Sequence, residues 1–592
     1  MFAKIHTTHQ NLKNCLKYFL SFGSDLFSLN HLFNQISKPV RQSTVLSLIF
    51  ILTFYPPLSF ASSPVEGLTP DGSTNTTVGY TANGTPYMNT ATTGANGTSI
   101  NRMSDFNVGS KNLAINNFAG SSSNMAINSN LAGIVQANPN LAVSGAARNI
   151  IAEVTSDRFS AINGYVEIVG QRADLVIANP NGISVNGGGF INTSRLSLVA
   201  GRPNMDGSGN VIDYTIGGTS QLFSPSDIAG QVLITARDVD GSNGVVIPLG
   251  IDASGSSYTD IIARTIKVSG EIYANNLSLK TGNNKATQDA AGDFTVTSDQ
   301  SITDNSIPIN SKIAIDSSYF GGMYAGRINL ISTENGLGVK TRGDLISDVG
   351  DIDMSAAGNV EYSNIISRNG NVNIATANQG NLSSLSNTSL ISAKHNNILN
   401  IAGDINNAGE INGNLLDVFA GGDIDNHGKL IGSNNLFIES LGNLNNSGDI
   451  YATNELSISS NNINNNSGLI LSNNILNIAA KSFTNSSSST IKSDNILSFY
   501  VADLFNYGKI LGNNKIIFSN LINLTNSGEN SSIYSSGNLT LDLFNLSNLD
   551  GSIINSDSNI SINVRNNFIN DHALVLALGN LDVTAESITN QN

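Results

Sequence analysis

The sequence is poor in charge: Asp, Glu, Lys and Arg make up 12% of its 592 residues, and tryptophan is absent. A typical globular protein carries roughly 25% charged residues. The hydrophobic fraction, 40%, is close to normal, whereas a disordered chain would lack apolar residues as well. Asn, Ser and Gly stand in place of the missing charge. This composition favours an ordered but polar all-β architecture.

Cysteine is almost absent, since the only one, Cys15, lies near the N-terminus. A single thiol excludes an intramolecular disulfide framework and a cysteine-based zinc site, and we expect no cofactor and no bound metal. The chain has 29 basic and 44 acidic residues, a formal net charge of −15. This balance argues against a nucleic-acid partner, because proteins that bind nucleic acid carry a basic surface.

Residues 1–61 are predicted to be a signal peptide with a long basic N-terminal region. Residues 45–55 (VLSLIFILTFY) form an apolar run, a Pro-Pro pair ends it, and Ser59 and Ala61 supply the small residues of a cleavage site. The run is too short to span a bilayer comfortably, so we expect export and not a membrane anchor. Cleavage would remove Cys15 and leave an exported chain without cysteine.

The second half of the chain is a repeat. An apolar-Asn-Asn-x-Gly motif recurs about every 20 residues, with Ser in place of Gly in some copies, and a Gly-Asp/Asn-apolar triplet opens many of the repeats. The copies lie at 385–389, 405–409, 424–428, 444–448, 465–468, 483–487, 505–508 and 524–528.

The repeat length predicts one coil of a parallel β-helix per repeat. Helical solenoid repeats need more than about 30 residues, and leucine-rich repeats need a leucine consensus that is absent here. The short runs between the motifs, such as residues 436–438, alternate with the period of strands. We expect apolar side chains inside, Asn side chains stacked as amide ladders at the turns, and motif glycines at corners with positive φ.

Two four-residue motifs in the first half predict tight turns. They are Asn138-Pro139-Asn140-Leu141 and Asn179-Pro180-Asn181-Gly182, and each follows an alternating apolar strand. Proline presets φ at the second position and the first Asn can bond back to its own backbone, which predicts a type I turn. From the residues alone, the motifs are either turns needed for stability or sites that a partner recognises.

The second motif belongs to a longer string that resembles the secretion domain of the two-partner secretion exoproteins, the filamentous haemagglutinin family. The string is residues 172–183 (RADLVIANPNGI), and residues 189–195 (GFINTSR) follow it. Further similar blocks occur in order from residue 101 to residue 336. Some members of the family carry a cysteine pair just after the second turn motif. Residues 185–188 contain none, which places the chain with the cysteine-free members.

The resemblance implies a division into the signal segment 1–61, a two-partner secretion (haemagglutination activity) domain 62–340, and Asn/Gly-rich β-helix repeats 341–592. It implies a right-handed parallel β-helix, and secretion or display at the surface of a Gram-negative bacterium through the periplasm and outer membrane. The implied partner is an outer-membrane β-barrel transporter with periplasmic adaptor domains. The two turn motifs are then the residues expected to serve secretion, by presenting a strand for β-augmentation.

Other candidate sites are weaker. The tripeptide Arg342-Gly343-Asp344 matches an integrin-binding sequence, but Gly343-Asp344 also begins an ordinary coil-opening triplet. The acidic residues in 238–241 and 348–353 lack a calcium-binding spacing. The sequence contains no nucleophile elbow, P-loop or dinucleotide loop. We therefore expect no enzyme, no catalytic residue and no metal ligand.

Three functions remain open. The first is a secreted or surface-held adhesin that binds a receptor on a host or neighbouring cell. The second is the N-terminal stalk of a contact-dependent growth inhibition toxin, and the third is a haem-acquisition or haemolysin-type exoprotein. Residues 568–572 and 588–592 keep the repeat register up to the last residue. That pattern favours the N-terminal piece of a longer or degraded exoprotein.

Overall fold

The computed structural model describes residues 67–217, 229–240, 246–299, 313–377 and 385–591. The chain divides into two units, Met1–Pro64 and Val65–Asn592. The predicted signal segment and its cleavage site lie outside the described residues. In the second unit, the described residues form strands and one short 3-10 helix.

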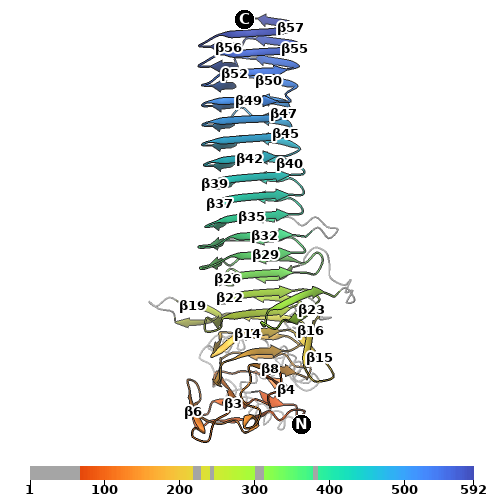
Figure 1. The fold of residues 1–592 in the computed structure, drawn as a ribbon, viewed down its shortest axis with the longest axis vertical. Coiled ribbons are helices and arrows are strands. Elements are labelled where there is room, and N and C mark those ends of the chain that lie inside the picture. The colour runs from red at the N-terminus through yellow and green to blue at the C-terminus, as the bar shows by residue number, and fades with distance from the viewer. Residues whose placement is uncertain (1–66, 218–228, 241–245, 300–312, 378–384, 592) are drawn as a thin grey trace, which may run out of the picture. The chain divides into compact units, whose positions relative to one another are not determined.

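The strands of this unit wind into a parallel β-helix of about 19 turns with about 21 residues in each. Figure 1 shows the coils stacked one on the next from β8 to β57. The predicted fold class and coil length are confirmed. Each strand pairs in parallel with its equivalent in the neighbouring coil, and these pairings follow three sides of the coil, here called faces A, B and C.

The strands of each face are as follows. Face A contains β9 (Ser160–Ile162), β12 (Ile183–Asn186), β17 (Gln231–Thr235), β21 (Thr265–Val268), β25 (Ile313–Ser317), β27 (Gly338–Thr341), β30 (Val360–Tyr362), β33 (Leu385–Asn387), β36 (Ile405–Asn407), β38 (Ile424–Asn426), β40 (Asn443–Asn446), β43 (Asn462–Asn465), β50 (Asn523–Ser527) and β53 (Asn545–Leu549). Face B contains β3 (Pro86–Asn89), β5 (Leu113–Asn117), β10 (Tyr165–Gly170), β13 (Gly188–Ile191), β19 (Val246–Ala253), β28 (Leu345–Ser347), β31 (Ile365–Ser367), β34 (Leu390–Ala393), β41 (Asp449–Ala452), β44 (Leu469–Ser472), β46 (Thr490–Ser493), β48 (Lys509–Gly512), β51 (Ser532–Ser535), β54 (Ile553–Ser556) and β56 (Leu574–Ala577). Face C contains β4 (Thr98–Phe106), β8 (Asn149–Val154), β11 (Ala173–Ala178), β14 (Thr193–Val199), β20 (Tyr258–Ala263), β29 (Ile352–Ala356), β32 (Val372–Thr376), β35 (Asn396–Ile401), β42 (Glu455–Ser459), β49 (Lys515–Ser519) and β52 (Leu539–Leu543).

Longer strands turn a corner and serve two faces. They are β22 (Glu271–Thr281), β26 (Met323–Ser332), β37 (Glu410–Ala420) and β39 (Lys429–Ser440) between faces B and C, and β45 (Ile475–Asn485), β47 (Ile496–Asn506), β55 (Ile560–Asp571) and β57 (Leu581–Gln591) between faces C and A. Because β26 pairs with both β28 and β29, the stacking is continuous across the predicted domain boundary at residue 340.

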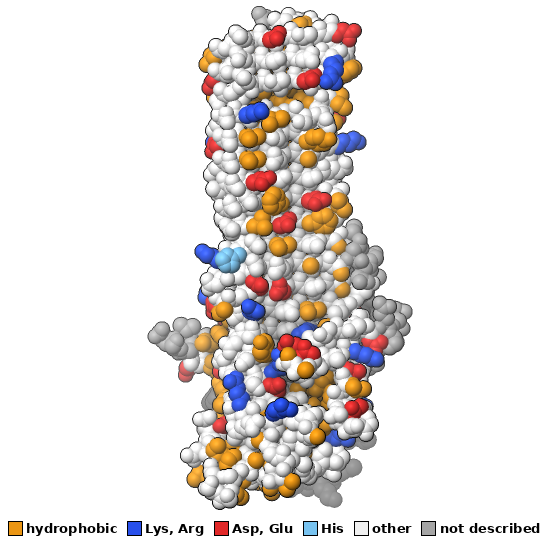
Figure 2. All heavy atoms as spheres, in the orientation of Figure 1, with side chains coloured by type: hydrophobic (Ala, Val, Ile, Leu, Met, Phe, Trp, Pro, Cys, Tyr) orange, Lys and Arg blue, Asp and Glu red, His pale blue; other side chains and the backbone are white. Residues whose placement is uncertain are grey.

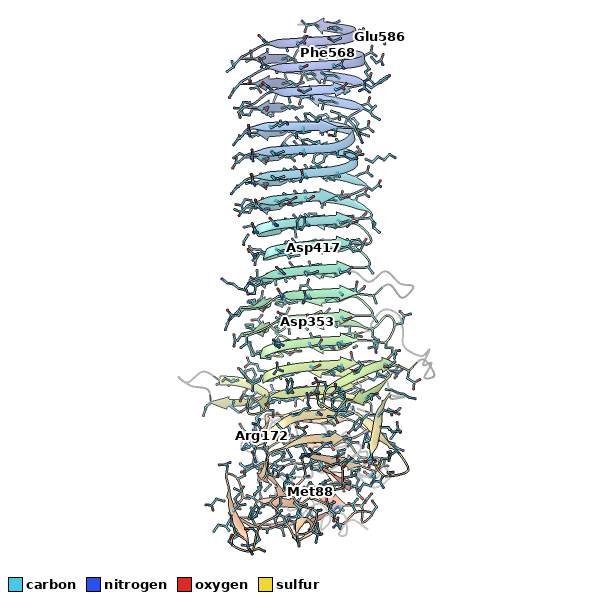
Figure 3. The ribbon with its side chains drawn as sticks, viewed as in Figure 1. Met88, Arg172, Asp353, Asp417, Phe568 and Glu586 are labelled. Atoms are coloured by element: carbon cyan, nitrogen blue, oxygen red, sulfur yellow. The ribbon has the colours of Figure 1, made fainter. Side chains whose placement is uncertain are left out.

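Apolar residues at alternate positions fill the interior. They form one hydrophobic cluster that runs from Met88 to Phe568, both of which Figure 3 labels. The intervening positions face outward, as Asp353 and Asp417 do on face C. Desolvation raises the pKa of Asp417. The outer surface seen in Figure 2 is mostly uncharged, in agreement with the low charge of the sequence.

A continuous ladder of asparagine side chains runs inside face A. From Asn387 onward, the Nδ2 of each ladder residue donates to the Oδ1 of the ladder residue in the next coil, at 2.7 to 3.0 Å. The predicted amide ladders are thereby confirmed, and this one is almost entirely buried. Its members are Asn387, Asn407, Asn426, Asn446, Asn465, Asn485, Asn506, Asn526, Asn548, Asn570 and Asn590.

The predicted positive φ of the motif glycines is wrong for most of them. Gly528 has a φ of 105°, but Gly409, Gly428 and Gly448 are not among the residues with positive φ. A Cβ on these three glycines would meet a backbone carbonyl oxygen of the preceding coil at 1.9 to 2.0 Å. Glycine is required there because adjacent coils approach too closely for a side chain, and not because of a left-handed backbone.

Several antiparallel strands are added to the first coils. At the N-terminal end, β1 (Leu68–Pro70) pairs with β4 and β2 (Thr77–Tyr80) pairs with β3. A hairpin is formed by β6 (Ala126–Ser129) and β7 (Gly133–Gln136), and β18 (Arg237–Asp240) pairs with β19. A four-stranded sheet of β15 (Gly201–Met205), β16 (Val211–Ile216), β23 (Asn284–Gln288) and β24 (Phe294–Ser298) packs on the outside of face C and buries a second apolar cluster.

Candidate functional site

The first turn motif folds around a buried asparagine. Asn138 precedes the 3-10 helix η1 (Pro139–Leu141), and its Oδ1 accepts a hydrogen bond from the backbone N–H two residues on, at 3.0 Å. The Leu141 N–H closes the turn on the Asn138 carbonyl at 3.1 Å. The Asn138 Nδ2 donates to the carbonyls of Thr90 and Asn116 at 2.9 and 3.0 Å. The predicted turn and its side-chain bond are both present.

The second motif repeats this arrangement. The Oδ1 of Asn179 accepts from the Asn181 N–H at 2.9 Å, and the Gly182 N–H donates to the Asn179 carbonyl at 3.1 Å. The Asn179 Nδ2 donates to the Arg158 carbonyl at 2.9 Å and to the Ser160 Oγ at 3.0 Å. Each motif therefore ties its own turn to another segment of the stack.

Burial separates the residues of the motifs into two groups. The side chains of Asn138 and Asn179 are fully buried, and Leu141 is buried with them. Pro139 is exposed, whereas Pro180 is half-buried. In the folded chain the first asparagine of each motif holds the turn, and Pro139 lies at the surface.

This division predicts different outcomes for two neighbouring substitutions. Asn138→Ala is expected to lower the free energy of unfolding by about 1–3 kcal/mol, because two backbone carbonyls each lose one buried donor. Pro139→Ala is expected to change it by less than about 1 kcal/mol. Urea unfolding of both variants, with the secreted amount measured in parallel, tests the assignment. A stable Asn138→Ala variant would contradict the structural role of the buried amide.

A buried carboxylate anchors the hairpin that leads into the first motif. Glu167, on β10, is 4% exposed. Its Oε1 accepts from the N–H and Nδ2 of Asn130 at 2.9 and 3.0 Å, and its Oε2 accepts from the Leu131 N–H at 2.9 Å and the Ser129 Oγ at 2.5 Å. Sequence reasoning missed this residue. Its signal was a single acid within the apolar run 165–169 (YVEIV).

Removing this carboxylate is expected to release the β6–β7 hairpin. Four hydrogen bonds to a charged acceptor disappear in Glu167→Ala, so we expect cleavage by a broad-specificity protease near Asn130 to rise about tenfold or more. Glu361→Ala removes an exposed carboxylate that pairs with Lys340 and serves as the matched control. Equal cleavage rates in the two variants would contradict the anchoring role.

Four charged side chains lie between face C and the outer four-stranded sheet. Arg195 pairs with Asp260 at 2.6 Å and with Asp293, and the second oxygen of Asp260 accepts from Lys280 at 3.1 Å. The Arg195 guanidinium also lies 4.3 Å from the ring centroid of Tyr258. Desolvation would lower the pKa of Arg195, but Asp260 and Asp293 outweigh it and raise that pKa. Through the pair of Arg195 with Asp293, the cluster links face C to the outer sheet.

The integrin-type tripeptide lies within the stack. Gly343 is buried, and a Cβ there would meet the backbone of the neighbouring coil at 2.6 Å. The Asp344 carboxylate accepts from the Asn364 Nδ2 at 2.9 Å. Arg342 is exposed, with its guanidinium 5.7 Å from the ring centroid of Tyr319. The structure places these residues in a coil corner far along the chain from the turn motifs.

Among the residues that the structure describes, no group of three or more His, Cys, Asp or Glu side chains is arranged to hold a metal ion. The part of the chain that the structure describes also contains no helix long and apolar enough to cross a membrane.

Both turn motifs lie in a part of the chain that matches a known protein family. The TPS secretion domain family matches residues 66–362, which include both motifs, Glu167 and the buried ion pairs. The chain belongs to the two-partner secretion exoproteins. A two-partner secretion exoprotein has a dedicated outer-membrane transporter as its partner, and such proteins are secreted or exposed at the surface of Gram-negative bacteria.

Curated relatives of this exoprotein resemble it over part of its length. It is 36% identical over 285 residues to a "tRNA nuclease CdiA" of Escherichia coli, which covers 48% of this chain and 8% of the relative. It is 34% identical over 327 residues to a "16S rRNA endonuclease CdiA" of Enterobacter cloacae, covering 55% of this chain and 9% of the relative. The chain thus spans less than a tenth of the length of these two relatives.

Solved structures of secretion domains also resemble the exoprotein. The filamentous hemagglutinin secretion domain aligns with a TM-score of 0.42 and 29% identity, over 55% of this chain and 95% of that one. The HMW1 secretion domain from Haemophilus influenzae aligns with a TM-score of 0.28 and 13% identity, over 88% of this chain and 100% of that one.

Proposed function

We propose that this exoprotein is an adhesin that reaches the cell surface through the periplasm and a β-barrel transporter with adaptor domains. The observation that carries the proposal is the unbroken stacking of the repeat coils on the secretion domain, seen where β26 pairs with β28 and β29. An array that continues from the secretion domain holds its outward faces away from the membrane, where they can meet a receptor on another cell.

The composition supports passage through a narrow pore. The only cysteine, Cys15, lies in the predicted signal segment, so the exported chain forms no disulfide in the oxidising periplasm. Stacking of coils outside the cell then buries apolar surface step by step, because repeat arrays propagate from a folded end. In this proposal the turn motifs present the strand that the adaptor domains pair with, and the chain has no catalytic role.

Cell binding tests the adhesin directly. The labelled, exported chain is incubated with host epithelial cells and with neighbouring bacteria, and bound label is measured against concentration. We expect saturable binding to at least one of the two, reduced by an excess of unlabelled chain. Binding that rises linearly and is not displaced on either cell type would contradict the proposal.

A second candidate, the stalk of a contact-dependent growth inhibition toxin, is favoured by the names of the relatives, among them "Toxin CdiA" of Yersinia pestis. In that case the coils are a spacer for a toxic domain on a longer chain. Sequencing the DNA beyond codon 592 separates the candidates. A continuing frame that encodes a nuclease or another toxin supports the stalk, and a frame without one supports the adhesin.

A further inference from the structure

The turns between faces A and B differ in length along the array. The turn is the segment between the ladder asparagine on face A and the first residue of the next face-B strand. After Asn506 it has two residues before Lys509, as in the coils at 407–410, 426–429 and 446–449. The turns in the coils on either side of it are longer: four residues, 486–489, and five residues, 527–531.

Both long turns are held in place from inside. Ser489 and Ser531 are each 1% exposed. The Ser489 Oγ donates to the Asn465 carbonyl at 2.7 Å, and the Ser531 Oγ donates to the Asn506 carbonyl at 2.9 Å. The long turns therefore form fixed walls on either side of the short turn at residues 507–508.

The space between the walls is a notch beside the turn that joins β47 to β48, and an aromatic residue is part of its lining. Its volume is about 430 Å³, within the roughly 300–1,000 Å³ of small-molecule sites. Tyr507 lies in it and is 38% exposed. The walls contribute Ser487 from one side and Glu529 and Asn530 from the other.

The polar groups of the notch have unused bonding capacity. Among the described residues, none forms a hydrogen bond with the side chains of Ser487, Tyr507, Glu529 or Asn530. By contrast, the Ser527 Oγ at the edge already donates to Asp550 at 2.7 Å. Two hydroxyls, an amide and a carboxylate thus face the same space as an aromatic ring, which offers a flat apolar surface.

We propose that this notch binds a neutral sugar residue of a cell-surface glycan. A pyranose has one apolar C–H face, which suits the ring of Tyr507, and a rim of hydroxyls, which can donate to Glu529 and both donate to and accept from Ser487 and Asn530. No Lys or Arg lines the notch, and the carboxylate repels an acidic sugar. The inference rests on the proposed adhesin function and assigns the class of its receptor.

The test measures binding of the full chain to immobilised neutral oligosaccharides built from glucose, galactose, mannose and N-acetylglucosamine. We expect binding to at least one of them, about tenfold weaker or more in Tyr507→Ala. Tyr500→Ala removes another exposed tyrosine, on face C outside the notch, and should bind within about twofold of the unmutated chain. Thermal unfolding of both variants checks that each is folded.

The outcomes separate this proposal from the adhesin function itself. The proposal that the notch binds a neutral sugar is overturned if the chain binds none of these oligosaccharides, or if folded Tyr507→Ala binds them as well as the unmutated chain does. If that result comes with saturable cell binding, the adhesin stands and its receptor lies elsewhere. If Tyr507→Ala loses both cell binding and oligosaccharide binding while Tyr500→Ala keeps both, the sugar-binding notch and the adhesin function are both supported.

Discussion

Replacing Asn465 by alanine is expected to lower the free energy of unfolding by about 2–5 kcal/mol. Asn465 stands in the middle of the internal ladder, where it accepts from Asn446 at 2.8 Å and donates to Asn485 at 3.0 Å. Its Nδ2 also donates to the Gly468 carbonyl at 3.0 Å. The substitution removes three buried hydrogen bonds, each worth about 1–3 kcal/mol when not fully compensated. The Oδ1 of Asn485 loses its donor, whereas the Asn446 Nδ2 keeps the Gly448 carbonyl and the Gly468 carbonyl keeps the Thr490 N–H.

The preceding residue provides the control. Asn464 faces outward on the same strand, and its Nδ2 donates to Asn445 at 2.9 Å in an exposed ladder. Asn464→Ala is expected to change stability by less than about 0.5 kcal/mol. Guanidinium unfolding of both variants, followed by circular dichroism, measures the difference. Similar losses in the two variants would show that burial of the ladder is not what makes it stabilising.

Replacing Asp260 by alanine is expected to cost about 3–5 kcal/mol, because it removes the shared partner of two buried cations. Lys280 would keep only its bond to the Ser278 Oγ, at 2.6 Å. Arg195 would keep the ring of Tyr258 and Asp293, which sits on the loop of the outer sheet. Hydrogen exchange should then rise in β14, β20 and β22, because the two pairs of Asp260 join these three neighbouring strands of face C.

An exposed ion pair is the control for this variant. Asp542 pairs with Arg565 at 3.1 Å, with both side chains more than half exposed. Asp542→Ala is expected to cost less than about 1 kcal/mol. If Asp260→Ala were no more damaging than Asp542→Ala, or if exchange in β14, β20 and β22 were unchanged, the buried carboxylate would not hold these strands together.

The parts of the fold that the sequence predicts are those that repeat locally. Coil length and the ladder follow from the 20-residue spacing of the Asn motif, because equivalent residues of adjacent coils must meet. The role of the motif glycines was assigned wrongly. A positive φ and a close approach both select glycine, and only the distance between Gly428 and the preceding coil distinguishes them.

Features that depend on pairing between distant segments could not be predicted. The outer sheet joins β16 to β23, which are separated by the coils between them, and no periodicity marks either strand. The geometry of the two turn motifs was predictable because proline and asparagine act within four residues. Their burial was not, since it depends on partners such as Thr90 and Ser160 in other segments.

The candidate binding notch also depends on how separate coils lie next to one another, so the sequence reveals only part of it. Its sequence signal is an irregularity in the repeat, where Ser replaces the motif Gly near residue 487 and extra residues follow Gly528. Spacing alone shows that the turns lengthen. It does not show that the short turn at Tyr507 lies between them with its ring exposed.

The most direct test of the central claim is export with and without the partner. The full chain is produced in a Gram-negative host, alone or together with its dedicated outer-membrane transporter, and protein is measured in the periplasm, on the surface and in the medium. We expect it on the surface or in the medium only when the transporter is present. Equal export without the transporter, or retention in the periplasm with it, would contradict two-partner secretion.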